Sequence, residues 1–297
     1  MEADRIFTDL KNNFINKDIV GRLITINVIV FIFVELVNVF LTLFKVHYNP
    51  LEQYLSLPAW LDKFIYQPWS LFTYMFMHGG LFHILFNMLW FYWFGKFFLN
   101  FYSSKHLRGL YVLGGICGGL LYMLAYNIFP YFDEMVFGAT LVGASASVLA
   151  IVVAAAVRQP EYPVQFMFIG TVRLKYVALF MIITDLMLMT SSNAGGHIAH
   201  IGGALAGLWF AVGLQNGHDA TKWINSVLDF FSRGMRFAPR KPKMKVHYGD
   251  RKQQYDYNTR KKANEDEINR ILEKLRNSGY GSLSDNEKKK LFDASRR

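Results

Sequence analysis

Charged residues and cysteines are scarce in this chain of 297 residues. Asp, Glu, Lys and Arg together make up 18% of it, whereas 53% is hydrophobic. A soluble domain of this length would carry more charge and shorter apolar runs, so the composition argues against an ordinary soluble globular protein. The single cysteine, Cys117, has no partner in the chain, and we expect it to pack as a small side chain in an apolar segment.

The first apolar segment also lacks the features of a cleaved signal peptide. It covers about residues 23–44, which is longer than a signal h-region, and no small-residue cleavage site follows it. Several further runs of about 18 or more mostly apolar residues occur later in the chain, and such runs are typical of membrane-spanning helices. We therefore predict an all-α, polytopic membrane protein that lies in a lipid bilayer.

Six spans account for these runs. They are predicted at residues 23–44, 78–98, 107–129, 137–157, 174–190 and 195–215. The sixth span contains Gly203 and Gly207 in GxxxG spacing, and the third span contains similar glycine spacings, which indicate close helix packing. In the first span Glu35 and Asn38 are three residues apart and share a helical face, so we interpret them as a buried polar contact between helices.

Positive charge is absent from two of the short loops, and this absence orients the chain. The third-to-fourth and fifth-to-sixth loops contain no Lys or Arg, whereas basic residues flank the second-to-third and fourth-to-fifth loops. Cytoplasmic loops are enriched in Lys and Arg, so both termini are predicted to lie in the cytoplasm. Lys45 and Lys63 in the long first loop are exceptions, but they are outnumbered.

The residues after 216 differ from the rest in composition. The net charge is +10, and beyond Gly217 there are 20 Lys and Arg against 11 Asp and Glu. We relate this asymmetry to membrane orientation and expect no nucleic-acid partner. Four regions are predicted: a short cytoplasmic N-terminus (1–22), a six-span core (23–216), an interfacial helix with a basic linker (217–262) and a small cytoplasmic helical hairpin (263–297).

Two patterns define the predicted tail. Residues 219–237 alternate aromatic and basic side chains, as in helices that lie on a membrane surface, and the basic linker at 238–262 would be attracted to anionic lipid. Ser284 and Glu287 have the spacing of a capping box at the start of a last helix. We expect the hairpin to dock an unknown partner or to regulate the core.

Three of the predicted spans carry polar residues at similar depths. With the N-terminus inside, spans two, four and six run in the same direction, and His83, Ser145 and His200 would lie roughly 7 to 12 Å below the outer surface. A serine hydroxyl needs a base and donors for the oxyanion, and Ser145 and His200 could supply nucleophile and base. His83 and Asn87 share one helical face and could form an oxyanion hole with the Ser145 backbone N–H, while His78 lies just before them.

At these positions the chain resembles the rhomboid intramembrane serine proteases, over about residues 22–215. Residues 77–90 are similar to the second span of that family, with its pattern of His, His and Asn. Residues 143–146 resemble the GxSG box, with Ala146 in place of the last glycine. Residues 199–207 resemble the sixth-span motif that carries the catalytic histidine.

The resemblance implies an activity and a set of roles. It assigns Ser145 as the nucleophile and His200 as the general base, a dyad without a carboxylate. Supporting roles fall to His83 and Asn87 at the oxyanion hole, Gly143 in a loop-like approach to the serine, and His78 in retaining water and structure near the site. Substrates would be single-span membrane proteins, cleaved near the outer leaflet after entry between spans two and five. A bacterial inner membrane is the location expected from the family.

Other interpretations of the same residues stay open. The small residues around Ser145 could serve helix packing alone. His197 and His200 could bind a metal, but a zinc site needs three or four ligands, and no carboxylate or cysteine is close to them in sequence, so we expect no metal and no cofactor. We assign His197 no role, interpret Asp185 as a helix-to-helix hydrogen bond, and expect Ser147 to point away from the site.

Two other classes of function are compatible with a polytopic membrane protein. An inactive rhomboid-like protein that binds membrane clients would be expected to have lost the serine or the histidine, and this chain keeps both. A transporter would often show repeated halves, and the sequence shows no such repeat.

Overall fold

The structure is a computed structural model that describes residues 18–166, 170–234 and 251–295. The chain divides into two compact units, residues 1–236 and residues 237–297. Helices make up most of both units, and the strands found in the described residues form two short antiparallel pairs in the first unit. This confirms the predicted all-α class.

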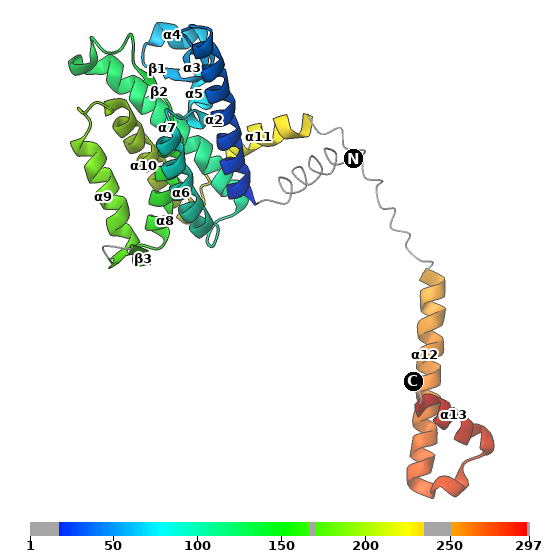
Figure 1. Cartoon of the computed structure of the whole chain (residues 1–297). Helices are drawn as coiled ribbons and strands as arrows, with labels where there is room; N and C mark the ends of the chain where they lie inside the picture. Colours follow the sequence, from blue (N-terminus) through cyan, green and yellow to red (C-terminus); the bar gives the residue numbers. More distant parts are fainter. Residues whose placement is uncertain (1–17, 167–169, 235–250, 296–297) are drawn as a thin grey trace. The chain divides into compact units, whose positions relative to one another are not determined.

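Six helices form the body of the first unit. They are α2 (Ile19–Leu43), α6 (Leu81–Phe98), α7 (Ser104–Ile128), α8 (Ser145–Arg158), α9 (Leu174–Met187) and α10 (Ala194–Gln215). The helices pack side by side in one bundle (Figure 1). Helices α7, α8 and α10 make the closest packed set, and almost every residue of α8 is buried. The centre of the bundle is therefore the helix that begins at Ser145.

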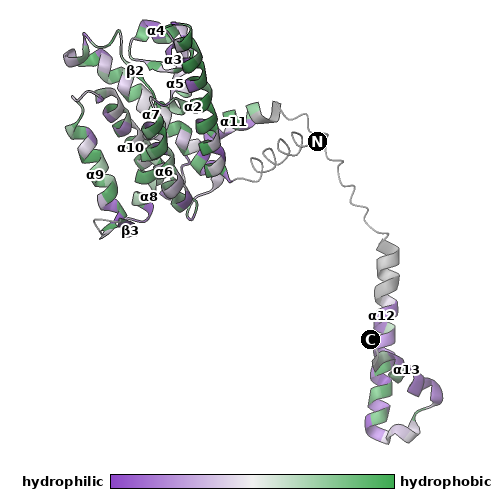
Figure 2. Cartoon of the chain, in the orientation of Figure 1, coloured by the Kyte–Doolittle hydropathy of each residue, from purple (hydrophilic) through white to green (hydrophobic). Residues whose placement is uncertain are grey.

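The lengths and surfaces of these helices agree with a membrane fold. Among the described residues, α2, α7 and α10 are long and apolar enough to cross a membrane, whereas α6 has 18 residues and α8 and α9 have 14 each. Large apolar side chains of α2, among them Ile29, Phe33 and Leu36, are exposed on its outer face, and Figure 2 shows the strongly hydrophobic character of this helix. Such side chains are stable in contact with lipid.

The prediction for the fourth span is wrong in its first half. Strand β2 (Thr140–Leu141) pairs antiparallel with β1 (Leu57–Pro58), and α8 begins only at Ser145. Ser145 therefore lies at a helix N-terminus and not eight residues into a helix, so the depth estimated from the helical rise does not apply to it. Helix α6 begins at Leu81, which places His78 in the loop before it and not inside the predicted second span.

Short elements form the connections between the long helices. The first loop contains α3 (Pro50–Leu55), α4 (Leu61–Tyr66), α5 (Ser70–Thr73) and the 3-10 turn η1 (Tyr74–Phe76). Another 3-10 turn, η2 (Pro130–Phe132), follows α7, and a hairpin of β3 (Pro163–Phe166) and β4 (Gly170–Arg173), which the sequence did not predict, joins α8 to α9.

The polar pair of the first span does not form the predicted buried contact between helices. Glu35 and Asn38 are only partly buried. They line a polar cavity of about 590 Å³ together with residues of the first loop and with His78. The pair therefore faces a polar space that the first loop covers.

Small residues allow the central helices to approach closely. A β-carbon on Gly203 would lie 2.1 Å from the carbonyl oxygen of Ala146, and one on Gly207 would lie 2.2 Å from that of Ala150. Both distances are far below a van der Waals contact, so only glycine fits at these positions. The predicted packing role of this GxxxG pair is confirmed, and Cys117 packs against the same core as expected.

Helix α11 (Lys222–Gly234) ends the first unit. Arg108 of α7 forms an ion pair with Asp229 at 2.7 Å and also hydrogen-bonds Asn225. Trp223, Val227, Phe230 and Phe231 are exposed on this helix. The helix predicted here is confirmed, its contact with a membrane surface stays a prediction, and residues 235–237 of the predicted segment lie outside the described residues.

The second unit is a helical hairpin, as predicted. It consists of α12 (Arg251–Ser278), the 3-10 turn η3 (Tyr280–Ser282) and α13 (Asp285–Ser295). Gly279, with φ of +72°, ends α12, and the side chain of Lys274 pairs with Glu287 across the hairpin. Residues 251–262 are helical, so the linker predicted at 238–262 is wrong there; its remainder, and residues 1–17 of the predicted N-terminus, lie outside the described residues.

Candidate active site

The chain reaches Ser145 in a conformation that requires glycine. Gly143 has φ of +127°, where L side chains are strained, and its N–H donates a 3.0 Å hydrogen bond to the Tyr74 carbonyl. The backbone then turns into α8 at Ser145. The first N–H groups of a helix have no intrahelical acceptor, and the helix dipole makes this end positive. The start of α8 is therefore suited to stabilise a negative charge beside the serine.

Three of the predicted site residues line one cavity. It has a volume of about 150 Å³, and its walls come from α6, α8, α9 and α10. Ser145 of α8, His200 of α10 and Asn87 of α6 all line it, with Phe86, Trp90 and Met181 among the apolar neighbours. No direct hydrogen bond joins Ser145 and His200 in the described part of the chain, and such catalytic contacts often shorten only when substrate binds.

His83 lies close to Gly143, which in turn lies close to Ser145. A β-carbon on Gly143 would lie 3.0 Å from Nε2 of His83 and 3.7 Å from Oγ of Ser145. Nδ1 of His83 accepts a 3.3 Å hydrogen bond from the Gly79 N–H, so in the neutral ring the proton sits on Nε2, the atom next to Gly143. This ring can donate a hydrogen bond in the neighbourhood of Ser145.

Asn87 is held one turn after His83 on α6. Its Nδ2 donates a 2.9 Å hydrogen bond to the His83 carbonyl. An amide nitrogen carries two hydrogens, so the second stays available for an acceptor in the cavity. Together with His83 and the backbone N–H of Ser145, this amide provides the donors that an oxyanion would need.

His78 lies beside His83, outside the cavity that Ser145 lines. It is buried in the loop before α6, and its ring packs edge-on against the ring of His83, with 5.2 Å between the ring centroids. It lines the polar cavity beside Glu35 and is not among the residues that line the Ser145 cavity. The structure therefore places His78 next to His83 and not next to Ser145.

Asp185 is the residue whose place in the site the sequence did not reveal. Its Oδ1 lies 2.8 Å from Nδ1 of His200 and 2.8 Å from Nδ1 of His197, and its side chain is only 7% exposed. The expectation that no carboxylate accompanies the two histidines is wrong, because the acid is on α9 and the histidines are on α10. The predicted helix-to-helix hydrogen bond of Asp185 is confirmed. An acid in an apolar segment was the signal that could have identified it.

These three side chains also have the donor types of a zinc site. Ligand atoms around a tetrahedral zinc ion with bonds of about 2.0 to 2.1 Å lie about 3.3 Å apart. The two oxygen-to-nitrogen distances of 2.8 Å are those of hydrogen bonds. The described geometry is therefore that of a carboxylate that accepts two imidazole N–H groups.

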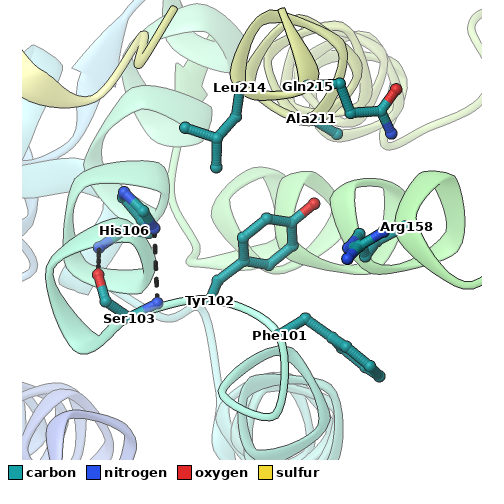
Figure 3. A pocket seen from close by; sticks show the side chains of 8 residues that line it. All are labelled: Phe101, Tyr102, Ser103, His106, Arg158, Ala211, Leu214 and Gln215. Carbon is teal, nitrogen blue, oxygen red and sulfur yellow. Dashed lines mark hydrogen bonds between the residues drawn. The ribbon is translucent and has the colours of Figure 1, made fainter. Parts of the chain in front are cut away.

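A larger cavity lies toward the other end of α10 (Figure 3). Its volume is about 430 Å³, and Tyr102, His106, Arg158 and Gln215 are among its lining residues. The side chains of Ser103 and His106 form the capping box of α7 and are engaged with backbone N–H groups (Figure 3). Because Gln215 follows His200 by 15 residues, this cavity is about 20 Å along the helix from the serine site.

Comparison with protein families agrees with this picture. A family model described as "Rhomboid domain" matches residues 66–216, which is half of the chain. That range contains each predicted site residue as well as Asp185. A second family model, described as "Family of unknown function (DUF6576)", matches residues 254–297, which cover most of α12 and all of α13. No curated protein matches the chain.

Proposed function

Because this chain belongs to the rhomboid family of intramembrane proteins, we propose that it is a serine endopeptidase that cleaves membrane-embedded segments of other proteins. One observation supports this activity most directly. Ser145, at the positive end of α8, shares a small cavity with the imidazole of His200 and the amide of Asn87. These are a nucleophile, a base and an oxyanion donor, brought together from three helices.

The reaction follows from these three groups. Oγ of Ser145 attacks the scissile carbonyl carbon while His200 accepts the hydroxyl proton, and the oxyanion is stabilised by the Ser145 N–H, Asn87 and His83. The tetrahedral intermediate collapses when His200 gives the proton to the leaving amine, which breaks the peptide C–N bond. A water molecule, deprotonated by His200, then hydrolyses the ester on Ser145 and restores the hydroxyl.

The walls of the cavity suggest how a substrate reaches it. Phe86 and Trp90 of α6 and Met181 of α9 line it beside the serine. The natural entry is therefore between α6 and α9, from the lipid, for a single-span membrane protein with helix-destabilising residues. We place the enzyme in a bacterial inner membrane as a multi-pass protein with both termini in the cytoplasm and the active site toward the outer leaflet.

A cleavage assay with matched variants tests the proposal. The full chain, purified in detergent, would be incubated with a single-span substrate that carries Gly and Pro near its outer end. We expect cleavage by the wild type and no cleavage by Ser145→Ala or His200→Ala. Ser147→Ala is the control, because Ser147 is buried two residues further along α8 and does not line the cavity.

The alternative is a catalytically inactive protein that binds membrane clients. It predicts that the folded wild type cleaves none of a panel of such substrates and that Ser145→Ala binds them as the wild type does. Equal cleavage by wild type and Ser145→Ala would contradict the proposed nucleophile.

A further inference from the structure

We propose that Asp185 is a positioning residue of the active site, which holds the His200 imidazole so that its second nitrogen accepts the Ser145 proton. The inference rests on the proposed protease activity and replaces the expected dyad by a Ser145–His200–Asp185 triad, in which the carboxylate orients the ring and takes up no proton. Its starting point is the 2.8 Å contact between Oδ1 of Asp185 and Nδ1 of His200, which joins α9 to α10.

The chemistry of the contact fixes the tautomer of the ring. An ionised carboxylate can only accept hydrogen bonds, so Nδ1 of His200 must carry the proton that it donates to Asp185. The neutral ring then has its lone pair on Nε2, on the opposite edge. A general base for Ser145 needs this form, because only a nitrogen with a free lone pair can accept the hydroxyl proton.

The burial of Asp185 and the presence of His197 explain how the carboxylate stays in place. Asp185 is buried, and burying a carboxylate that has no hydrogen bonds would cost free energy. Nδ1 of His197, one turn before His200 on α10, provides a second contact of 2.8 Å to the same oxygen. Two donors from one helix thus anchor the acid, and His197 shares this anchoring role without lining the Ser145 cavity.

A purely structural tie between α9 and α10 would predict different consequences. In that case any substitution that breaks the tie lowers stability, and a substitution that keeps the shape has little effect. A positioning role predicts that Asp185→Asn, which keeps the shape, is harmful. The amide can donate its N–H to Nδ1 of His200, which places the ring proton on Nε2 and removes the base. In soluble serine proteases with a triad, the corresponding change lowers kcat about 10⁴-fold.

The test combines kinetics with a direct reading of the tautomer, on the full chain in detergent micelles. We expect Asp185→Asn to lower kcat by about 10² to 10⁴-fold with KM changed less than about threefold, and Asp185→Glu to recover part of the loss. Asp133→Asn, the same substitution at an exposed side chain in the loop after η2 that does not line the Ser145 cavity, is the matched control and should stay within about twofold of the wild type.

The second readout is the ¹⁵N spectrum of histidine-labelled protein, with His200 assigned from the His200→Ala variant. We expect the wild-type ring to carry its proton on Nδ1 and the Asp185→Asn ring to carry it on Nε2. A proton on Nε2 in the wild type would overturn the inference, and this result does not depend on how well a variant folds. A kcat of folded Asp185→Asn within threefold of the wild type would overturn it as well.

Two further outcomes separate this inference from its rivals. Loss of activity with a metal chelator, together with zinc that is bound by the wild type and not by Asp185→Asn, would show that Asp185, His197 and His200 hold a metal and would overturn the inference. A wild type that is inactive but has the proton of His200 on Nδ1 would contradict the proposed protease function, while the contact between Asp185 and His200 would stand.

Discussion

The α-carbon of Gly203 on α10 faces the carbonyl oxygen of Ala146 on α8, and a β-carbon at Gly203 would lie only 2.1 Å from that oxygen. This crossing also sets the geometry of the proposed active site. Ala146 follows Ser145 directly, and Gly203 lies three residues after His200, on the same face of α10. The approach of the two helices therefore determines how far the serine is from the histidine.

Gly203→Ala should lower both stability and activity. The added methyl group forces two backbones apart, and overpacking of this kind costs about 1 to 3 kcal/mol. We expect a lower thermal midpoint in detergent and a loss of cleavage even in the molecules that stay folded. Leu205→Ala, at a side chain of α10 that is 56% exposed, is the control and should leave both nearly unchanged. Wild-type cleavage by a folded Gly203→Ala protein would contradict the role of this crossing.

Gly143→Ala tests the approach to the serine. The φ of +127° is unfavourable for alanine by about 1 to 3 kcal/mol, and the new β-carbon would contact the His83 ring at 3.0 Å. We expect kcat to fall by at least tenfold. Gly138→Ala is a matched control in the same segment, because nothing lies within 4 Å of its added β-carbon. Equal activity of the two variants would show that the geometry at Gly143 does not support catalysis.

Asn87→Ala should act on the chemical step. Removal of one oxyanion donor typically costs about 10²- to 10³-fold in kcat, with a smaller effect on KM. Asn127→Ala is a suitable comparison, since that amide donates to the carbonyls of Ala59 and Met123, ties α7 to the first loop and does not line the Ser145 cavity. Steady-state kinetics of both variants would show whether the Asn87 amide acts on the chemical step or on substrate binding. A rise in KM with unchanged kcat for Asn87→Ala would assign this amide to substrate binding.

The capping box of α13 predicts a pH dependence in the tail. The Ser284 N–H, and then Lys274, hold the pKa of Glu287 at about 2, below its usual 4.5. Because the pKa is lower in the folded chain, the stabilisation is complete above about pH 4.5 and is lost as the pH falls through about 2. Hydrogen exchange of α13 in the full chain, corrected for intrinsic rates, should show this loss.

Glu287→Gln provides the comparison for that measurement. The variant lacks the titrating group, so the protection of its last helix should depend less on pH in this range. Asp285→Asn, at a fully exposed side chain, should behave as the wild type. Identical acid profiles for wild type and Glu287→Gln would show that another group controls the helix.

The sequence predicted the features that depend on local pattern. The apolar period and the charged flanks predicted the ends of α7 and α10 to within about three residues of their positions in the structure. The glycine spacing predicted the close packing of these helices. The capping box predicted the start of α13, where the Glu287 N–H donates to Ser284 Oγ at 3.4 Å and the Ser284 N–H donates to Glu287 Oε2 at 2.7 Å. Ser145, His200 and Asn87 do line one cavity, while their catalytic roles stay proposals.

Other features depend on contacts between distant segments. Residues 137–144 are apolar enough for a helix, but they form a turn and the short strand β2, which pairs with β1 about 80 residues earlier in the chain. The pairing of Asp185 with His200 likewise depends on the packing of α9 against α10. No local pattern encodes either contact, which is why the start of α8 and the contact of Asp185 with His200 were missed.

Covalent labelling by a fluorophosphonate probe tests the central claim most directly, because such probes react with an activated serine. The full-length wild type would be labelled in detergent and the modified residue identified by mass spectrometry of its peptides. We predict a single phosphonylated residue, Ser145, with labelling lost in Ser145→Ala and strongly slowed in His200→Ala. Labelling of another residue, or no labelling of a folded wild-type sample, would contradict the account.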